Sequence, residues 1–263
     1  LRGFWMGYFG FRAAPLGPVG PAAVEATFAN FAPAMVRRSI PDAWMYATPA
    51  TLAGTRGEAA AAALRRLVPD IEPIAGDCND PLLEIVRAAD PLGRPLFAAN
   101  AALPLPDDPV ARLWQLSTTL REHRGDGHVA ALVVEGLDGP SAHQLHAADH
   151  DTPHEVLQPN RGWDDEAWAS AAARLAARGL LDDGRLTPAG RDLRDRIEHT
   201  TDELAVAPID RALDADAFTS LVDRLTGAAA RVASSGAIPF PNPMGLPALP
   251  AGAIGGSSDK MGG

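Results

Sequence analysis

The sequence predicts a mainly α fold, and three observations support this class. Apolar residues recur at three- and four-residue spacing in segments that begin at capping residues and end at glycine or proline, as helices do. One short segment, residues 180–187, has the pattern of a β-hairpin. The second half has the order helix, short helix, long helix, hairpin, helix, which is typical of a winged helix-turn-helix module. We expect this module to follow a helical N-terminal module.

Composition and charge exclude several classes of protein. The chain has 263 residues, 46% of them hydrophobic, so it can bury a core, and its net charge of −10 disfavours broad nucleic-acid binding. Cys78 is the single cysteine, which rules out an intrachain disulfide and a cysteine-based zinc site and fits a cytoplasmic location. No apolar run reaches the roughly 18 residues of a transmembrane helix, and no signal peptide is recognisable. Leu1 lies in a helix-like segment, so we expect the natural N-terminus to precede it.

Residues 1–68 are expected to form three helices. FWMGYFGFRAAPLG gives the first, which stops at Pro15. GPAAVEATFANFAPAMVRRSI gives the second, with Val24, Phe28 and Phe31 on one apolar stripe. TPATLAGTRGEAAAAALRRLV gives the third, which ends in two arginines, as the helix dipole prefers.

The next segments are less regular. Residues 69–108 are broken by prolines, so we expect a connector with one short helix, DPLLEIVRAA, and a domain boundary. Residues 109–137 predict one or two helices, with Gly125 and Gly127 between PVARLWQLSTTLREHR and GHVAALVVEGL. A short helix, SAHQLHAA, is expected to be capped by Ser141.

The winged-helix pattern begins at the helix WDDEAWASAAARLAARG, which has acidic residues in its first turn and Gly179 at its end. Asp183 and Gly184 suit the tight turn of a hairpin. Thr187 and Pro188 then suit the N-cap and the first position of the following helix. The expected parts are a helical N-terminal module (1–68), a Pro-rich connector (69–108), a winged-helix module (109–205), a C-terminal helical segment (206–245) and a flexible tail (246–263).

Both halves contain a segment opening with GP, then an acidic residue close before a tryptophan, then an Ala-rich helix. The pattern arises either from an internal duplication or from chance similarity between Ala-rich segments.

The motifs also carry a family resemblance. RLAARGLLDDGRLTPAGRDLRDRIEHTTD resembles the wing and last helices of MarR-type regulators. GYFGFRAAPLG, FANFAPAMV, LREHRGDGHVAAL, RGWDDEAW and PNPMG resemble an actinobacterial MarR-like helix-turn-helix family of uncharacterised function, over about residues 1–245. The resemblance implies a winged-helix architecture. It also implies that residues 188–206 and ADAFTSLVDRLTGAAARVA form a homodimer interface.

The resemblance implies double-stranded DNA as a partner, but the charges of the expected recognition helix oppose DNA binding. The helix before the wing would read the major groove, yet it begins with Asp164, Asp165 and Glu166, which repel phosphates. Arg185 in the wing and Arg161 before that helix are the candidate DNA contacts.

A small-molecule site is the other possibility. The HRGDGH stretch, residues 123–128, packs four ionisable groups into six positions, and a His–Asp pair can act as an acid–base couple. The alternative is a helix–turn–helix junction in which Asp126 caps the second helix. The candidate ligand-binding residues are Arg12, Asn30, Trp114, His123, Arg124, Asp126 and His128.

Histidines suggest a metal as a further option. His123, His128, His143 and His146 are the candidate ligands, although they match no strong metal-binding motif and solvated loop histidines would explain the second pair.

Three functions remain open. The first is a ligand-responsive MarR-like regulator. The second is a small-molecule binder or enzyme on a degenerate winged-helix scaffold, with a His/Arg/Asp pocket that holds a metal or cofactor, and the third is a protein–protein adaptor. No phosphate-binding loop, dinucleotide fingerprint or nucleophile elbow occurs, so the sequence names no cofactor.

Overall fold

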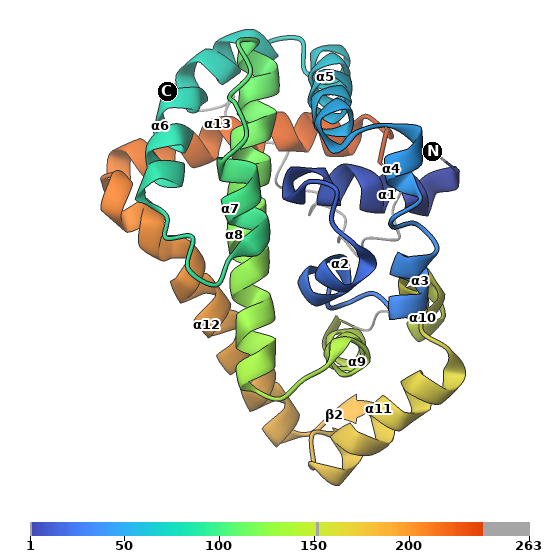
Figure 1. Cartoon of the computed structure of the whole chain (residues 1–263). Helices are drawn as coiled ribbons and strands as arrows, with labels where there is room; N and C mark the ends of the chain where they lie inside the picture. The colour runs from blue at the N-terminus through green and yellow to red at the C-terminus, as the bar shows by residue number, and fades with distance from the viewer. Residues whose placement is uncertain (1, 151–152, 239–263) are drawn as a thin grey trace.

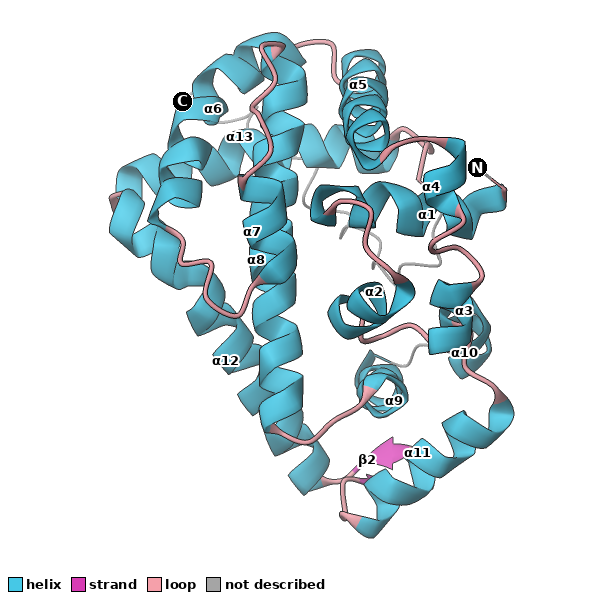
Figure 2. Cartoon of the chain, viewed as in Figure 1, coloured by secondary structure: helices cyan, strands magenta, loops and turns pink. Residues whose placement is uncertain are grey.

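The computed structural model describes residues 2–150 and 153–238, and these residues are mainly helical (Figure 2). The expected tail, 246–263, and the PNPMG motif lie outside the described residues. The elements in chain order are α1 (Gly3–Ala13), the 3-10 helix η1 (Ala14–Leu16), α2 (Pro21–Thr27), α3 (Pro33–Arg37), α4 (Ala43–Tyr46), α5 (Pro49–Leu67), α6 (Ile71–Ala88), α7 (Pro95–Ala101), α8 (Pro109–Val134), α9 (Gly139–His150), α10 (His154–Arg161), α11 (Asp165–Ala177), β1 (Leu181–Asp182), β2 (Arg185–Leu186), α12 (Pro188–Ala212) and α13 (Ala215–Ser234).

Helix α8 is the central element (Figure 1). Its 26 residues span about 39 Å, and it packs against α5, α6, α7 and α12. The sequence predicted one or two helices here, with Gly125 and Gly127 between them in the second case, and the structure has one continuous helix. A helix interior tolerates glycine at a cost of about 1 kcal/mol each, which the packing of this helix on four others offsets.

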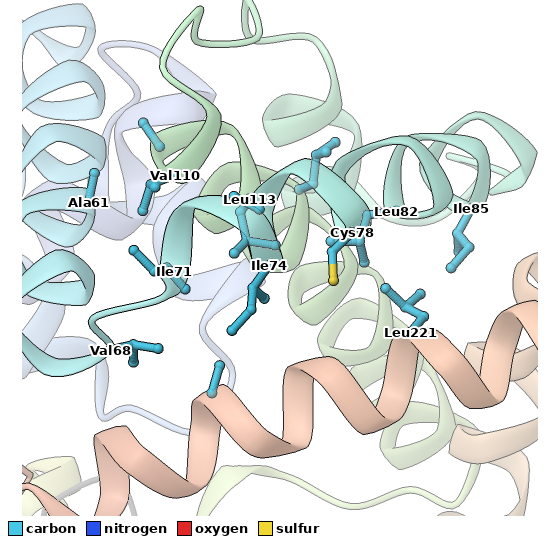
Figure 3. Close-up of a cluster of buried hydrophobic side chains, with 14 residues drawn as sticks. Ala61, Val68, Ile71, Ile74, Cys78, Leu82, Ile85, Val110, Leu113 and Leu221 are labelled. Carbon is cyan, nitrogen blue, oxygen red and sulfur yellow. The ribbon is translucent and has the colours of Figure 1, made fainter.

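The first core cluster joins α5, α6, α8 and α13 (Figure 3). Helix α6 contributes a stripe at helical spacing that includes Ile71, Ile74 and Cys78. Residues 69–108 therefore hold an 18-residue helix and the shorter α7, where the sequence suggested a connector with one short helix. The prolines made this helix hard to predict: Pro73 lies in the first turn of α6, where no backbone N–H is needed, and Pro81 lies inside the helix, which continues through it.

The second cluster holds the N-terminal helices together. Phe9, Phe28 and Val24 are fully buried in it, which confirms the apolar stripe expected there. The single helix expected over residues 20–40 is instead two short helices, α2 and α3. Pro33 explains the break, because a residue that precedes proline avoids the α conformation and Ala32 is extended.

The third cluster forms the winged-helix region. The hairpin is present, with Leu181 opposite Leu186 in antiparallel register. Asp183 and Gly184 both have positive φ, at 45° and 73°, as the tight turn requires. Thr187 caps α12 through its hydroxyl, as predicted. Helix α9, in contrast, begins before Ser141, and Asp138 accepts the Ser141 N–H at 3.1 Å, so Ser141 is not the cap.

Helices α12 and α13 were expected to pair two chains. In the structure α12 lies along α8 and α6, and α13 covers α6 with Leu221 and Ala228 in the first core cluster (Figure 3). Much of their apolar surface is therefore buried within the chain.

Within residues 2–150 and 153–238, no helix has the length and apolar character that crossing a membrane requires.

Candidate functional site

The HRGDGH stretch lies inside α8 and makes no turn. Asp126 therefore does not cap a second helix, and the expected helix–turn–helix junction is wrong. Gly127 has a packing reason instead, since a Cβ atom there would lie 2.7 Å from Nη1 of Arg94. That guanidinium donates to the carbonyl oxygen of His123, so the glycine lets Arg94 approach the α8 backbone.

Side chains of this part of α8 point to three different neighbours. Glu122 faces α1, where Arg12 donates to both carboxylate oxygens at 3.0 and 2.8 Å. Asp126 faces α7 and accepts the backbone N–H of Phe97 at 2.9 Å. His128 faces α12, with its Nδ1 3.0 Å from the Thr201 hydroxyl. The stretch thus locks α8 to its neighbours and does not converge on one pocket.

His123 and Asp126 do not act as a pair. His123 is buried edge-on against Phe97, with ring centroids 4.9 Å apart. Burial lowers its pKa to about 4, helped by the charges of Arg94 and Arg211, so the imidazole is neutral at pH 7. Arg124 points outward and forms ion pairs with Glu198 and Asp202 of α12 at 3.2 and 3.1 Å.

Asp126 gives a stability prediction. Burial raises its pKa, so the ionised form is disfavoured in the folded state and this cost disappears as the pH falls through the folded pKa. In Asp126→Asn the amide oxygen can still accept from Phe97. We therefore expect this variant to lower the free energy of unfolding at about pH 7 by less than about 1 kcal/mol, or to raise it.

The control is Asp126→Leu, which leaves the buried Phe97 N–H without its acceptor and should cost about 1–3 kcal/mol. Urea unfolding measures both variants. A loss for asparagine as large as the loss for leucine would show that the charge itself, which both variants remove, stabilises the fold.

The expected metal site is not formed. The Nε2 of His143 is 3.1 Å from the main-chain oxygen of Asn30, and His146 stacks on His150. In the part of the chain that the structure describes, no three His, Cys, Asp or Glu side chains lie close enough to hold a metal ion. His123 is separated from the other candidates because it faces α7.

A small cavity of about 180 Å³, the inner pocket, lies among α8, α9, α10 and α12. Its polar lining includes Asn30, His128, His143, His146, Arg161 and Arg194. Burial lowers the pKa of all three histidines, to about 3 for His143 and about 4 for His146. Neutral imidazoles line this pocket, which unites Asn30 and His128 of the predicted ligand set.

A larger cavity of about 680 Å³, the outer pocket, lies between α1, α5 and α8. It brings together Arg12 and Trp114 of the predicted set. Its other lining residues are Gly3, Phe4, Gly7, Tyr8, Phe11, Arg56, Thr118 and Arg121. The volume is in the range of small-molecule sites, and the walls are mainly apolar, with four aromatic side chains among them.

Arg56 and Arg121 were not predicted. Trp114, Thr118 and Arg121 are spaced four and three residues apart, so a continuous α8 would have placed them on one face. Arg56 stacks on Trp114, with its guanidinium carbon 4.8 Å from the ring centroid. Nothing in the sequence links Arg56 to α8, since the contact joins residues far apart in the chain.

Helices α10 and α11 form the helix-turn-helix. Gly162 joins them with φ of 74°, and a Cβ atom there would lie 2.9 Å from Met35. Glycine is therefore required by both the backbone and the packing. Asp164 caps α11 by accepting the Ala167 N–H at 2.8 Å. The hairpin of β1 and β2 follows α11, which is the arrangement of a winged helix-turn-helix.

Residues 1–239 match a family described as a helix-turn-helix family. The chain belongs to this helix-turn-helix family. Neither the curated proteins nor the solved structures include a match to it.

In this helix-turn-helix protein the two expected DNA contacts have different surroundings. Arg161 is buried, with its guanidinium 5.0 Å from the centroid of Phe31, so it cannot reach a phosphate and that expectation is corrected. Arg185 is exposed on β2, and its side chain makes no hydrogen bond or ion pair within the described residues.

The arginines of α11 and its C-cap are already occupied. Arg174 pairs with Asp138, and Arg178 donates to the carbonyl oxygens of Glu135 and Gly136. They hold α11 against the end of α8. The exposed start of α11 carries Asp165 and Glu166. The surface of this helix therefore has more acidic than basic side chains without an ion-pair partner in the described residues.

Proposed function

We propose that this helix-turn-helix protein is a ligand-responsive, MarR-like regulator that binds a small molecule in the outer pocket and DNA through its winged-helix region. One observation supports this best: α8 belongs to both places. Trp114, Thr118 and Arg121 of α8 line the pocket. About 15 Å farther along the same helix, Ala131 and Leu132 lie in the core of the winged-helix region.

A continuous helix is a physical means of coupling. A ligand that favours one position of α8 against α1 and α5 also favours one position of the helix end on which α9 and α12 pack. The ligand can shift that equilibrium only by its difference in affinity for the two arrangements. Arg124 strengthens the link because it ties the middle of α8 to α12.

DNA binding through this module would rest on few charges. Arg185 is free to meet a phosphate, while the acidic first turn of α11 opposes entry into the major groove. We therefore expect weak, salt-sensitive binding, made stronger by a homodimer that presents two modules.

Selection of genomic DNA fragments at low salt tests the proposal. We expect an enriched DNA sequence, and we expect Arg185→Ala to bind it more weakly. The affinity of this variant should also depend less steeply on salt concentration, by about the share of one phosphate contact. Arg87→Ala, which removes an exposed arginine of α6, is the matched control and should not change binding. Absence of any enriched sequence would contradict the DNA-binding half.

The alternative is a small-molecule binder or enzyme that has kept the fold and lost DNA reading. The occupied Arg174 and Arg178 and the acidic start of α11 favour it. A ligand in the outer pocket together with no enriched DNA would support this second function.

A further inference from the structure

The outer pocket combines apolar walls with an excess of positive charge. Three arginines line it, Arg12, Arg56 and Arg121, and no acidic side chain of the described residues does. Glu122 lies behind the wall and pairs with Arg12 at 2.8 Å and with Arg121 at 3.3 Å. One carboxylate therefore faces three guanidinium groups, and a ligand entering the pocket meets a site that is net cationic.

The three arginines differ in how far they are occupied. Each nitrogen of the Arg12 guanidinium already donates, because Nε and Nη2 bond the two oxygens of Glu122 and Nη1 bonds the Tyr8 hydroxyl at 3.0 Å. Arg121 is exposed, with 56% of its side chain accessible, and the long contact to Glu122 is its ion pair within the described residues. Its guanidinium can therefore take a second anion.

Arg56 is a partly buried cation with incomplete hydrogen bonding. It donates to the carbonyl oxygen of Phe11 at 2.9 Å and to Asn100 at 3.2 Å. Its Nε is buried and has no hydrogen-bond partner in the described chain. Burial lowers the pKa of Arg56 to about 10, against the opposing charge of Glu122. An anion in the pocket would interact favourably with the charge of this partly buried cation.

Resting on the proposed ligand-binding function, we infer that the outer pocket takes a small carboxylic acid with an apolar, ring-containing body. Guanidinium groups match the planar carboxylate with paired N–H donors, and the exposed Arg121 can present such a pair to the ligand. Trp114, Phe11 and Tyr8 offer ring faces and edges to the apolar body.

Gly7 makes the pocket testable without removing a contact. It lines the cavity from α1, and a Cβ atom there would meet only the Phe11 ring, at 3.9 Å. A leucine at this position therefore projects into the cavity. Since glycine is the poorer helix former, by about 1 kcal/mol, the variant should fold at least as well as the wild type.

The experiment is calorimetric titration of the full chain with two matched pairs of probes. The aromatic pair is naphthalene-2-carboxylate and naphthalene-2-carboxamide, and the aliphatic pair is decanoate and decanamide. We expect naphthalene-2-carboxylate to bind about tenfold or more tightly than its amide. Arg121→Met should remove that preference and leave amide binding unchanged, and Gly7→Leu should weaken both.

The matched control is Arg124→Met. Arg124 is an exposed arginine on the same helix that pairs with α12 outside the pocket, so this variant should keep the preference. Folding of each variant is checked by its thermal midpoint.

The outcomes separate the inference from the proposed function. If acid and amide bind equally and Arg121→Met has no effect, the carboxylate inference is overturned while ligand binding stands. If decanoate binds better than naphthalene-2-carboxylate, the ring-containing body is overturned. If no probe binds the wild type, or Gly7→Leu leaves binding intact, the outer pocket is not the ligand site and both are overturned.

Discussion

Arg12→Leu is expected to lower the free energy of unfolding by about 3–5 kcal/mol, because it leaves a buried carboxylate without its main partner. The side chain of Glu122 is 1% exposed and that of Arg12 is 18% exposed. Burial alone would raise the pKa of Glu122, yet the hydrogen bonds and charge of Arg12 lower it below its usual value. The ion pair therefore stabilises the charged form, and this contribution is lost as the pH falls through the folded pKa.

Two further variants test the physical reason. In Arg12→Leu/Glu122→Leu the buried charge is gone, so most of the loss should be recovered. Arg37→Leu breaks the ion pair between Arg37 and Glu25. This pair has the same two-bond geometry, but the Arg37 side chain is 64% exposed, so the free energy of unfolding should fall by less than about 1 kcal/mol. Urea unfolding measures all three. A double variant no more stable than Arg12→Leu would contradict the buried-charge explanation.

Lowering the pH from about 7 to about 5 is expected to cost on the order of 2 kcal/mol for each of His123 and His143. Burial lowers their pKa values to about 4 and about 3, and nearby arginines add to this. An unfolded histidine, with a pKa near 6.5, binds a proton in this range while the folded one does not. The unfolded state therefore takes up more protons, and stability falls with the pH.

His143→Gln isolates one of these contributions. Glutamine can still donate to the main-chain oxygen of Asn30 but does not titrate. The stability lost between the two pH values should be smaller in this variant by about the share of one histidine. His199→Gln is the control, since it makes the same substitution at a side chain that is 74% exposed. An equal loss in all three proteins would show that His143 does not titrate between the two states.

Local chemistry made several features predictable. The hairpin follows from Asp183 and Gly184, whose positive φ values suit few other residues, and the start of α12 follows from Thr187 and Pro188. The buried stripe of Val24 and Phe28 follows from its spacing. These features depend on residues a few positions apart, so a sequence window contains all the information.

The candidate site was predictable only in part. Arg12 and Trp114 were singled out and do line one pocket, but His123, Asp126 and Arg124 point to three other places. Density of ionisable groups in a sequence suggests a site only if their side chains share a face. On one helix, residues 123 to 128 span more than a full turn, so their side chains point in different directions.

The sequence by itself determined α11, the wing and the start of α12, because caps, turns and apolar period are local properties, whereas it did not predict α10, the first helix of the helix-turn-helix. Only the tertiary structure decided that α8 is continuous, that Arg12 meets Glu122 across 110 positions and that Arg56 joins the same pocket. Such contacts depend on how helices pack, which stabilises a glycine-containing helix and a buried ion pair that neither segment could sustain alone. The pocket that defines the proposed function is therefore a product of the packing.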